Sequence, residues 1–248
     1  MENIEYAIGS AFNDTFIGDE GNNTFEGLGG CDSIDGGDGT ADRVSYNQMP
    51  GPLGVEVDLR FQSAITPDYD CDHPEAFTNI EGVIGSHADD TLIGDDGPNS
   101  LGGLGGDDIL IGLGGDDSLS GWEGNDAISG GPDDDKIWPG AGDDIAYGGS
   151  EVDLLTYADI GAGVEVNLAL EATGGAAGND IVVDFENVQG SQFDDTLIGD
   201  AFDNVLWGLG GDDALDGGDG DDTLDGGDGN DTCDPGTGND PVPQNCEP

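Results

Sequence analysis

A repeat of nine residues runs through most of this chain and limits what it can fold into. From Gly103 onward the sequence reads GLGGDDILI, GLGGDDSLS and GWEGNDAIS, and the same phase continues to Thr156. The consensus is Gly-Gly-x-Gly-(Asn/Asp)-Asp-x-apolar-x. Related units begin at Gly9 and Gly190, so the repeat falls into three blocks. Self-similarity at a short fixed period is typical of solenoids, in which each unit packs only on its neighbours.

Two segments without an obvious repeat separate the blocks. We expect a first block at 1–45, a connector at 46–79, a second block at 80–156, a connector at 157–184, and a third block with a C-terminal cap at 185–248, together forming one elongated domain. Apolar and polar residues alternate from Gly54 to Leu59 and from Gly163 to Leu168. This alternation predicts one half-buried strand in each connector.

The charge balance excludes several classes of partner. The chain has 56 acidic and three basic residues, a formal charge of −53, and 48 glycines. Nucleic-acid binding requires basic residues that displace phosphate counterions, and anionic membrane surfaces would repel this chain. No apolar run approaches the roughly 18 residues of a membrane-spanning helix. High charge with low hydrophobicity is typical of disorder, so the carboxylates need neutralising, and hard divalent cations with oxygen ligands are the candidates.

Each position of the repeat has a predicted structural role. The glycines permit tight turns with positive φ, and the sixth-position Asp adds a charged oxygen. The last three residues form a short strand whose apolar side chain, at position eight, points inward. The predicted core ladders are Leu92, Leu101, Leu110, Leu119, Ile128 and Ile137 in the second block, and Leu197, Leu206, Leu215 and Leu224 in the third. One apolar residue in nine cannot fill a sizeable core.

This nonapeptide resembles the calcium-binding repeat of RTX (haemolysin-type) proteins. The arrangement of blocks is similar to the C-terminal calcium-binding region of serralysin-type secreted proteins. The resemblance implies an all-β fold, a right-handed parallel β-roll with two units per coil. It also implies that each Ca²⁺ lies between the turns of units i and i+2, with carbonyl oxygens joining two sixth-position Asp carboxylates. Pairs of units so related give roughly twelve calcium sites at most.

The resemblance assigns ligands residue by residue. The side-chain ligands would be Asp14, Asp32, Asp90, Asp108, Asp117, Asp126, Asp135, Asp144, Asp153, Asp195, Asp213, Asp222, Asp231 and Asp240, with Asn23, Asn99 and Asn204. The carbonyl ligands would come from Gly103, Gly105, Gly106, Gly112, Gly114, Gly115, Gly121, Gly124, Gly130, Gly208, Gly210, Gly211, Gly217, Gly218, Gly220, Gly226, Gly227 and Gly229.

Some units depart from the consensus. The second unit of every block has Asn at position six and Asp at position two, which suggests weaker or differently shaped sites where each block opens. In the unit from Gly36, Ala41 occupies position six with Asp42 next, so we expect no regular site there. Fifth-position Asp residues such as Asp107 are expected outside the direct ligand set. Pro241 and Pro243 predict the end of the roll, because proline disrupts strand pairing.

Four cysteines allow three pairings. We favour Cys31–Cys71 and Cys233–Cys246, since the first pair flanks the first connector and the second flanks the C-terminal end. These pairings imply an oxidising compartment. The alternative is free thiols, with Cys233 filling an inward position-eight slot.

No catalytic motif is recognised: HExxH and GxSxG are absent, and Trp122, Trp138 and Trp207 are expected to be scattered surface aromatics. We therefore expect a secreted, non-enzymatic and monomeric module that folds on binding calcium and serves stability or attachment at a cell surface. The alternatives are a non-catalytic accessory part of a larger secreted enzyme, such as a protease, lipase or polysaccharide epimerase, and calcium-dependent ice adhesion.

Overall fold

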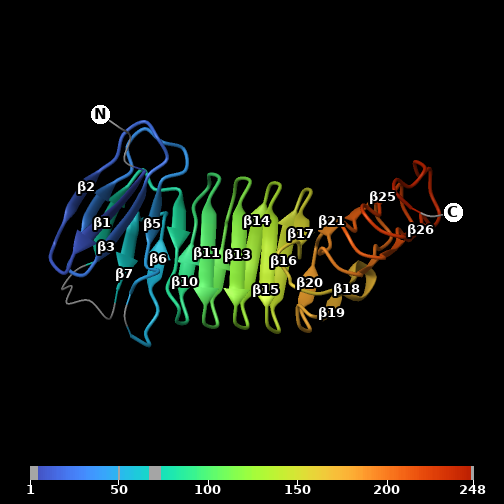
Figure 1. Cartoon of the computed structure of the whole chain (residues 1–248). Coiled ribbons are helices and arrows are strands. Elements are labelled where there is room, and N and C mark those ends of the chain that lie inside the picture. The colour runs from blue at the N-terminus through green and yellow to red at the C-terminus, as the bar shows by residue number, and fades with distance from the viewer. Residues whose placement is uncertain (1–4, 50, 67–73, 247–248) are drawn as a thin grey trace.

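The computed structural model describes residues 5–49, 51–66 and 74–246. These residues form a rod of stacked coils, with β1 and β26 near its opposite ends (Figure 1). Two sheets run along the rod. In spatial order the first sheet contains β1 (Tyr6–Ser10), β3 (Thr24–Leu28), β5 (Arg43–Ser45), β9 (Gly82–Ile84), β11 (Ser100–Gly105), β13 (Ser118–Glu123), β15 (Lys136–Ala141), β17 (Leu154–Thr156), β21 (Asn187–Gln189), β23 (Val205–Trp207) and β25 (Thr223–Asp225).

The second sheet faces the first and includes both connectors. In spatial order it contains β2 (Thr15–Ile17), β4 (Ser33–Asp35), β8 (Glu75–Thr78), β7 (Ser63–Ile65), β6 (Glu56–Asp58), β10 (Thr91–Ile93), β12 (Ile109–Ile111), β14 (Ala127–Pro132), β16 (Ile145–Ser150), β20 (Ile181–Val183), β19 (Ala172–Gly175), β18 (Val164–Asn167), β22 (Thr196–Ile198), β24 (Ala214–Asp216) and β26 (Thr232–Asp234). A short 3₁₀ helix, η1 (Leu168–Leu170), follows β18.

Successive repeat units alternate between the two sheets, so two units make one coil. Leu101 lies beside Leu119 in the first sheet, and Leu110 lies beside Ile128 in the second. All strand pairs within the blocks are parallel, and the chain is an all-β roll, as predicted. Parallel strands stack about 4.8 Å apart, which places each turn of a coil directly against the turn of the next.

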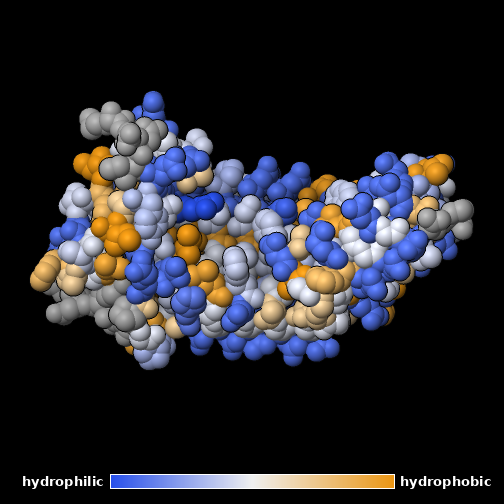
Figure 2. All heavy atoms as spheres, viewed as in Figure 1, coloured by the Kyte–Doolittle hydropathy of each residue, from blue (hydrophilic) through white to orange (hydrophobic). Residues whose placement is uncertain are grey.

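The apolar ladder between the sheets forms the core, as the repeat pattern predicts. All ten predicted ladder residues are exposed by 3% or less. Their neighbours at positions seven and nine point outward, and examples such as Ile109 and Tyr147 are 45% exposed. Hydrophilic residues line both long edges of the middle of the rod, where the turns lie (Figure 2). Each unit therefore contributes one apolar side chain to the core, and the turns make up much of the remaining structure.

The connectors extend the second sheet only. The predicted strands correspond to β6 and β18, which pair in parallel with β10 and β22. In each connector an antiparallel strand, β7 or β19, joins this strand to the preceding coil. The first sheet passes the connectors without interruption, since β5 pairs directly with β9 and β17 with β21. The sheets are therefore continuous through all three blocks.

The second connector contains a repeat unit that sequence analysis missed. Residues 175–183 read GAAGNDIVV. Their strand β20 pairs with β16, so that Ile145 lies beside Ile181 and Ala146 beside Val182. The segment thus forms half a coil on top of the second block, although only two of its glycines match the consensus.

Candidate metal-binding turns

The position-six side chains form two columns, one at the N-terminal ends of the strands of each sheet. Within a column, the backbone N–H of one position-six residue donates to Oδ1 of the Asp one coil further on. Asp108 donates in this way to Asp126 at 2.8 Å, and Asp126 to Asp144 at 2.8 Å. In the first-sheet column Asp117 donates to Asp135 at 2.8 Å. These bonds fix each carboxylate between two stacked turns.

The second carboxylate oxygen of most of these residues is buried without a hydrogen-bond partner. The residues whose Oδ2 atom is buried without a partner are Asp32, Asp42, Asp108, Asp117, Asp126, Asp135, Asp144, Asp153, Asp213, Asp222 and Asp231. An isolated buried carboxylate oxygen is costly unless a cation or a donor compensates it. The same atom in the same environment recurs along the whole rod, so the compensation must also recur with the period of the coil.

Backbone carbonyl oxygens approach these unpartnered oxygens at the glycine positions of the turns, as the turn of Asp126 shows. A Cβ added to Gly121, at position one, would lie 2.2 Å from Asp126 Oδ2 and 2.4 Å from Pro139 O in the next coil. Gly124, at position four, has φ +140°. A Cβ there would lie 1.8 Å from the carbonyl oxygen of Gly106. The glycines therefore hold open an oxygen-lined space between turns, and oxygen is the ligand that Ca²⁺ prefers.

Burial strongly affects the ionisation of these carboxyls. Desolvation raises the pKa of Asp108, Asp117, Asp144 and Asp153 to about 7, and that of Asp126, Asp135 and Asp213 to about 6. Neighbouring carboxylates in the turns add to the rise, for example Asp90 and Asp126 around Asp108. A divalent cation in the turn would oppose both effects, because it favours the ionised form.

The turns fall into two conformational classes. Position two has positive φ in the inner units, at residues that include Leu104, Leu113 and Trp122. In this conformation the N–H of position two can point to the neighbouring coil. The N–H of Leu113, for example, donates to Gly130 O at 3.0 Å. In the two opening units of each block, position two is Ser or Asp, and none of these described residues has positive φ.

In the opening units the position-six side chain is satisfied within its own turn. Ser86 donates from its N–H to Asp90 Oδ2 at 2.5 Å and from its hydroxyl to Asp90 Oδ1 at 2.9 Å. Ser191 makes the same pair of bonds to Asp195 at 2.5 and 2.9 Å. In the first block, Ser10 donates to Asp14 at 2.6 Å. The predicted ligands Asp14, Asp90 and Asp195 therefore already have donors that the inner aspartates lack.

In the opening units, Asn99 and Asn204 form hydrogen bonds through both the oxygen and the nitrogen of the side-chain amide. Asn99 Oδ1 accepts from the N–H of Asp95 at 2.7 Å, and Asn204 Oδ1 accepts from that of Asp200 at 2.8 Å. The Asn204 amide nitrogen donates to Glu186 O at 2.9 Å, and that of Asn99 donates to Glu81 O at 3.3 Å. A carboxylate cannot donate, so asparagine fits the joint between a connector and a block.

Asp42 is a site residue that the nonapeptide register missed. It is fully buried, its Oδ1 accepts from the N–H of Asn23 at 2.6 Å, and its Oδ2 has no partner. The extra residue in this unit is accommodated before Asp42, because Arg43 and Val44 keep their register with Thr24 and Phe25. Aligning the unit on its strand rather than its glycines would have found Asp42 from the sequence.

The other residues that the sequence singles out have different environments. Fifth-position side chains form a separate exposed ladder, in which Asp107 accepts from the N–H of Asn125 at 2.8 Å. Asp240 is half-buried at the end of the first-sheet column and accepts from Asp222 at 2.8 Å. Trp122 and Trp138, expected as scattered surface residues, together line a surface hollow of about 280 Å³ with Tyr157 and Ile160.

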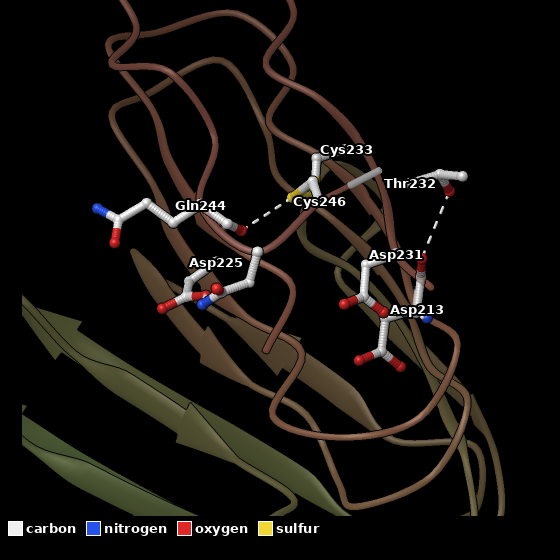
Figure 3. Close-up of a disulfide and its surroundings, with 8 residues drawn as sticks. Asp213, Asp225, Asp231, Thr232, Cys233, Gln244 and Cys246 are labelled. Carbon is white, nitrogen blue, oxygen red and sulfur yellow. Dashed lines mark hydrogen bonds between the residues drawn. A yellow bond between two sulfur atoms is a disulfide. The ribbon is translucent and has the colours of Figure 1, made fainter. Parts of the chain in front are cut away.

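The C-terminal cysteines form the predicted disulfide. Cys233 and Cys246 have Cα atoms 5.9 Å apart, and their bond ties β26 to the C-terminal tail (Figure 3). Cys233 also takes the inward position beside Leu215. Cys31 is disulfide-bonded, whereas its predicted partner, Cys71, lies outside the described residues.

Within the described residues, no group of three or more His, Cys, Asp or Glu side chains is placed to hold a metal ion by itself. The oxygens that the turns bring together are carboxylate oxygens and backbone carbonyls. No helix in the described part of the chain is long and apolar enough to cross a membrane.

Parallel sheets joined by oxygen-lined glycine turns define the class of calcium-binding β-rolls. Residues 8–40, 84–119, 102–137, 123–155, 189–224 and 210–240 match the RTX calcium-binding nonapeptide repeat. These matches cover more than half of the chain, which therefore belongs to this family of calcium-binding repeats. A comparison with curated proteins gave no match.

Proposed function

We propose that the inner turns bind calcium ions and that binding drives the folding of the whole rod. The observation that carries this proposal is the series of buried carboxylate oxygens without a hydrogen-bond partner, which lie at glycine turns where carbonyl oxygens of neighbouring coils approach closely. Bound Ca²⁺ supplies the positive charge that compensates these buried carboxylate oxygens. The chain is then a non-enzymatic calcium-binding module.

The proposed ligands are the aspartates with an unpartnered oxygen, together with the carbonyls assigned from the sequence at the glycines of the adjoining turns. Asp42 joins the ligands expected from the sequence. At the opening coils we assign carbonyl contributions, since Asp14, Asp90 and Asp195 already accept hydrogen bonds from the N–H groups of serines in their own turns. Asp240 completes the first-sheet column of the third block.

The energetics favour folding that depends on calcium. At a free calcium concentration about ten times Kd, each site contributes roughly 1.4 kcal/mol. Roughly ten such sites would supply about 14 kcal/mol, comparable to the whole stability of an ordinary domain. Without calcium, the chain retains a formal charge of −53 and a core to which each repeat unit contributes one apolar side chain.

The test is a calcium titration followed by far-UV circular dichroism, with magnesium and with NaCl of matched ionic strength as controls. We expect strand content to appear with calcium, and not with sodium, because Na⁺ only screens the charge. Mg²⁺ demands compact octahedral geometry and should be much less effective. Native strand content in excess chelator would contradict the proposal.

We further propose that the chain functions outside the cell, in a structural or surface-attachment role. The Cys233–Cys246 disulfide supports this location, since such bonds persist in oxidising compartments. Weak calcium sites, with Kd of about 10⁻⁴–10⁻³ M, are typical of extracellular modules. Measuring the folding midpoint in calcium tests this: a midpoint in the nanomolar range would favour an intracellular role.

A further inference from the structure

Two buried tyrosines end the second-sheet column at the same structural position in two blocks. Tyr157 is 1% exposed, and its hydroxyl donates to Asp180 Oδ2 at 2.7 Å. Asp180 is 2% exposed, and its Oδ1 accepts from the N–H of Asp144 at 3.1 Å. Asp180 thus occupies position six of the coil that follows Asp144, but its second oxygen has a donor.

The first connector repeats this arrangement with different residues. Ser33 lies beside Ala76, which places Glu75 next to Asp32 in the second-sheet column. The hydroxyl of Tyr46 donates to Glu75 Oε2 at 2.7 Å, and Glu75 is 3% exposed. Tyr46 and Tyr157 each come directly after the last first-sheet strand of their block. The recurrence with Glu in one case and Asp in the other indicates a function for the tyrosine hydroxyl itself.

Asp180 otherwise lies in a turn like those of the inner units. Gly178, at position four, has φ +127°, and a Cβ there would lie 1.6 Å from Gly142 O. This is the geometry of Gly124 and Gly142, whose coils contain unpartnered carboxylate oxygens. What distinguishes the last turn is the phenolic donor on the carboxylate, together with Thr173 of β19, whose side chain also hydrogen-bonds to Asp180.

We propose that the hydroxyls of Tyr157 and Tyr46 take the place of a calcium ion at the last turn of the second-sheet column, and so end the row of sites. This inference rests on the proposed function. A hydroxyl provides one hydrogen bond to one carboxylate oxygen and needs no further ligands, so the column can end beside an antiparallel strand. The last sites on this side are then those of Asp32 and Asp144.

The experiment locates ions by anomalous scattering in crystals grown with calcium. In the wild-type protein we expect ions beside Asp126 and Asp144 and none beside Asp180. In Tyr157→Phe, which leaves the Asp180 oxygen without its donor, we expect one additional ion at that turn. Tyr157→Phe/Asp180→Asn should lose this ion. Tyr147→Phe, at a tyrosine that is 45% exposed, is the matched control and should leave the pattern unchanged.

Bound calcium is also counted by equilibrium dialysis with the wild-type protein and Asp180→Asn. We expect equal counts, because Asp180 is not a ligand while Tyr157 caps it. An ion beside Asp180 in the wild type, a lower count in Asp180→Asn, or no additional ion in folded Tyr157→Phe would overturn the inference. If Tyr157→Phe does not fold, the wild-type crystal and Asp180→Asn decide. A wild-type protein that binds no calcium would instead refute the proposed function.

Discussion

The same residue at position six has three environments along this rod. In opening coils the donors belong to its own turn, as with Ser86 and Asp90. In inner coils one oxygen has no donor, as in Asp126. In the coil that follows the second block a tyrosine supplies the donor, as with Tyr157 and Asp180. What a given aspartate can do therefore depends on the φ of position two and on the neighbouring coil, rather than on the residue type.

Asp126→Asn should have opposite effects with and without calcium. The amide keeps Oδ1 as the acceptor for Asp108 but removes the buried negative charge. In saturating calcium we expect a loss of roughly 1.4 kcal/mol or more, since one site is weakened. In chelator we expect the substitution to be neutral or stabilising. Urea unfolding monitored in both conditions measures this.

Asp107→Asn is the matched control for Asp126→Asn. Asp107 is exposed in the outer ladder, and asparagine occurs naturally at the same position in Asn125. We expect a change within about 0.5 kcal/mol in either condition. Equal effects of the two substitutions would show that the inner and outer aspartates are not distinct.

The pH dependence should also change sign with calcium. Burial raises the folded-state pKa of Asp108 and Asp144 to about 7, far above the ordinary value of 3.8. Without calcium, folding is therefore favoured by protonation below pH 4, and this contribution is lost as pH rises through about 7. Because calcium and protons compete for these oxygens, calcium affinity should fall as pH drops below 7. Calorimetry in buffers of different ionisation enthalpy should detect proton release on binding near pH 7, and its absence would contradict this linkage.

At the scale of single residues, the sequence predicts the inner aspartates of the candidate site and misses the residues that depart from the repeat. Fixed phase identifies the inner aspartates, because each follows the glycines by the same spacing. It misses Asp42, where an extra residue in the turn shifts the register while the strand keeps it. It also misses the tyrosine caps, because Tyr157 and Asp180 meet only through folding and no repeat relates them.

At the scale of the coil, glycine is required where successive turns come closest. Gly124 combines φ +140° with a carbonyl oxygen where its Cβ would be. Position two tolerates leucine or tryptophan at positive φ, as in Leu104 and Trp122. Backbone strain alone is therefore accommodated in these turns, whereas the close approach of the preceding coil at Gly124 leaves no room for a side chain.

Gly124→Ala should disrupt the stacking of coils in the second block. Positive φ and the 1.8 Å approach to Gly106 O both oppose a methyl group, so we expect a loss of well over 1 kcal/mol and a higher calcium midpoint. Gly102→Ala is the control, because nothing lies within 4 Å of its added Cβ. Circular dichroism across a calcium titration compares them. Equal midpoints for the two variants would be inconsistent with close stacking at position four.

Connector elements were only partly predictable. Alternating apolar residues identify β6 and β18, because burial on one face imposes a period of two. The unit at 175–183 was missed because Ala176 replaces the second consensus glycine and an inserted strand separates the unit from the second block. Its position becomes evident only from the pairing of β20 with β16.

Across the whole molecule, each coil contacts only its neighbours, and both sheets continue through the connectors. Stability in such a structure is approximately a sum of coil and interface terms. The two ends differ from the middle, because a terminal coil has one neighbour instead of two. At the C-terminal end, the Cys233–Cys246 bond ties the last coil to the tail (Figure 3).

Removing this disulfide by Cys233→Ser/Cys246→Ser, which leaves the disulfide of Cys31 in place, should therefore have a local effect. In saturating calcium we expect faster amide exchange in β26 and the adjoining turns, with little change in β11 to β15. Asp126→Asn, in the middle of the rod, should increase exchange in the coils on both sides of it, because each coil there has two interfaces. Hydrogen–deuterium exchange with mass spectrometry distinguishes the two patterns. Uniformly faster exchange along the rod in the Cys233→Ser/Cys246→Ser variant would mean that the coils unfold as one cooperative unit, and nearest-neighbour stability would then be the wrong description of this protein.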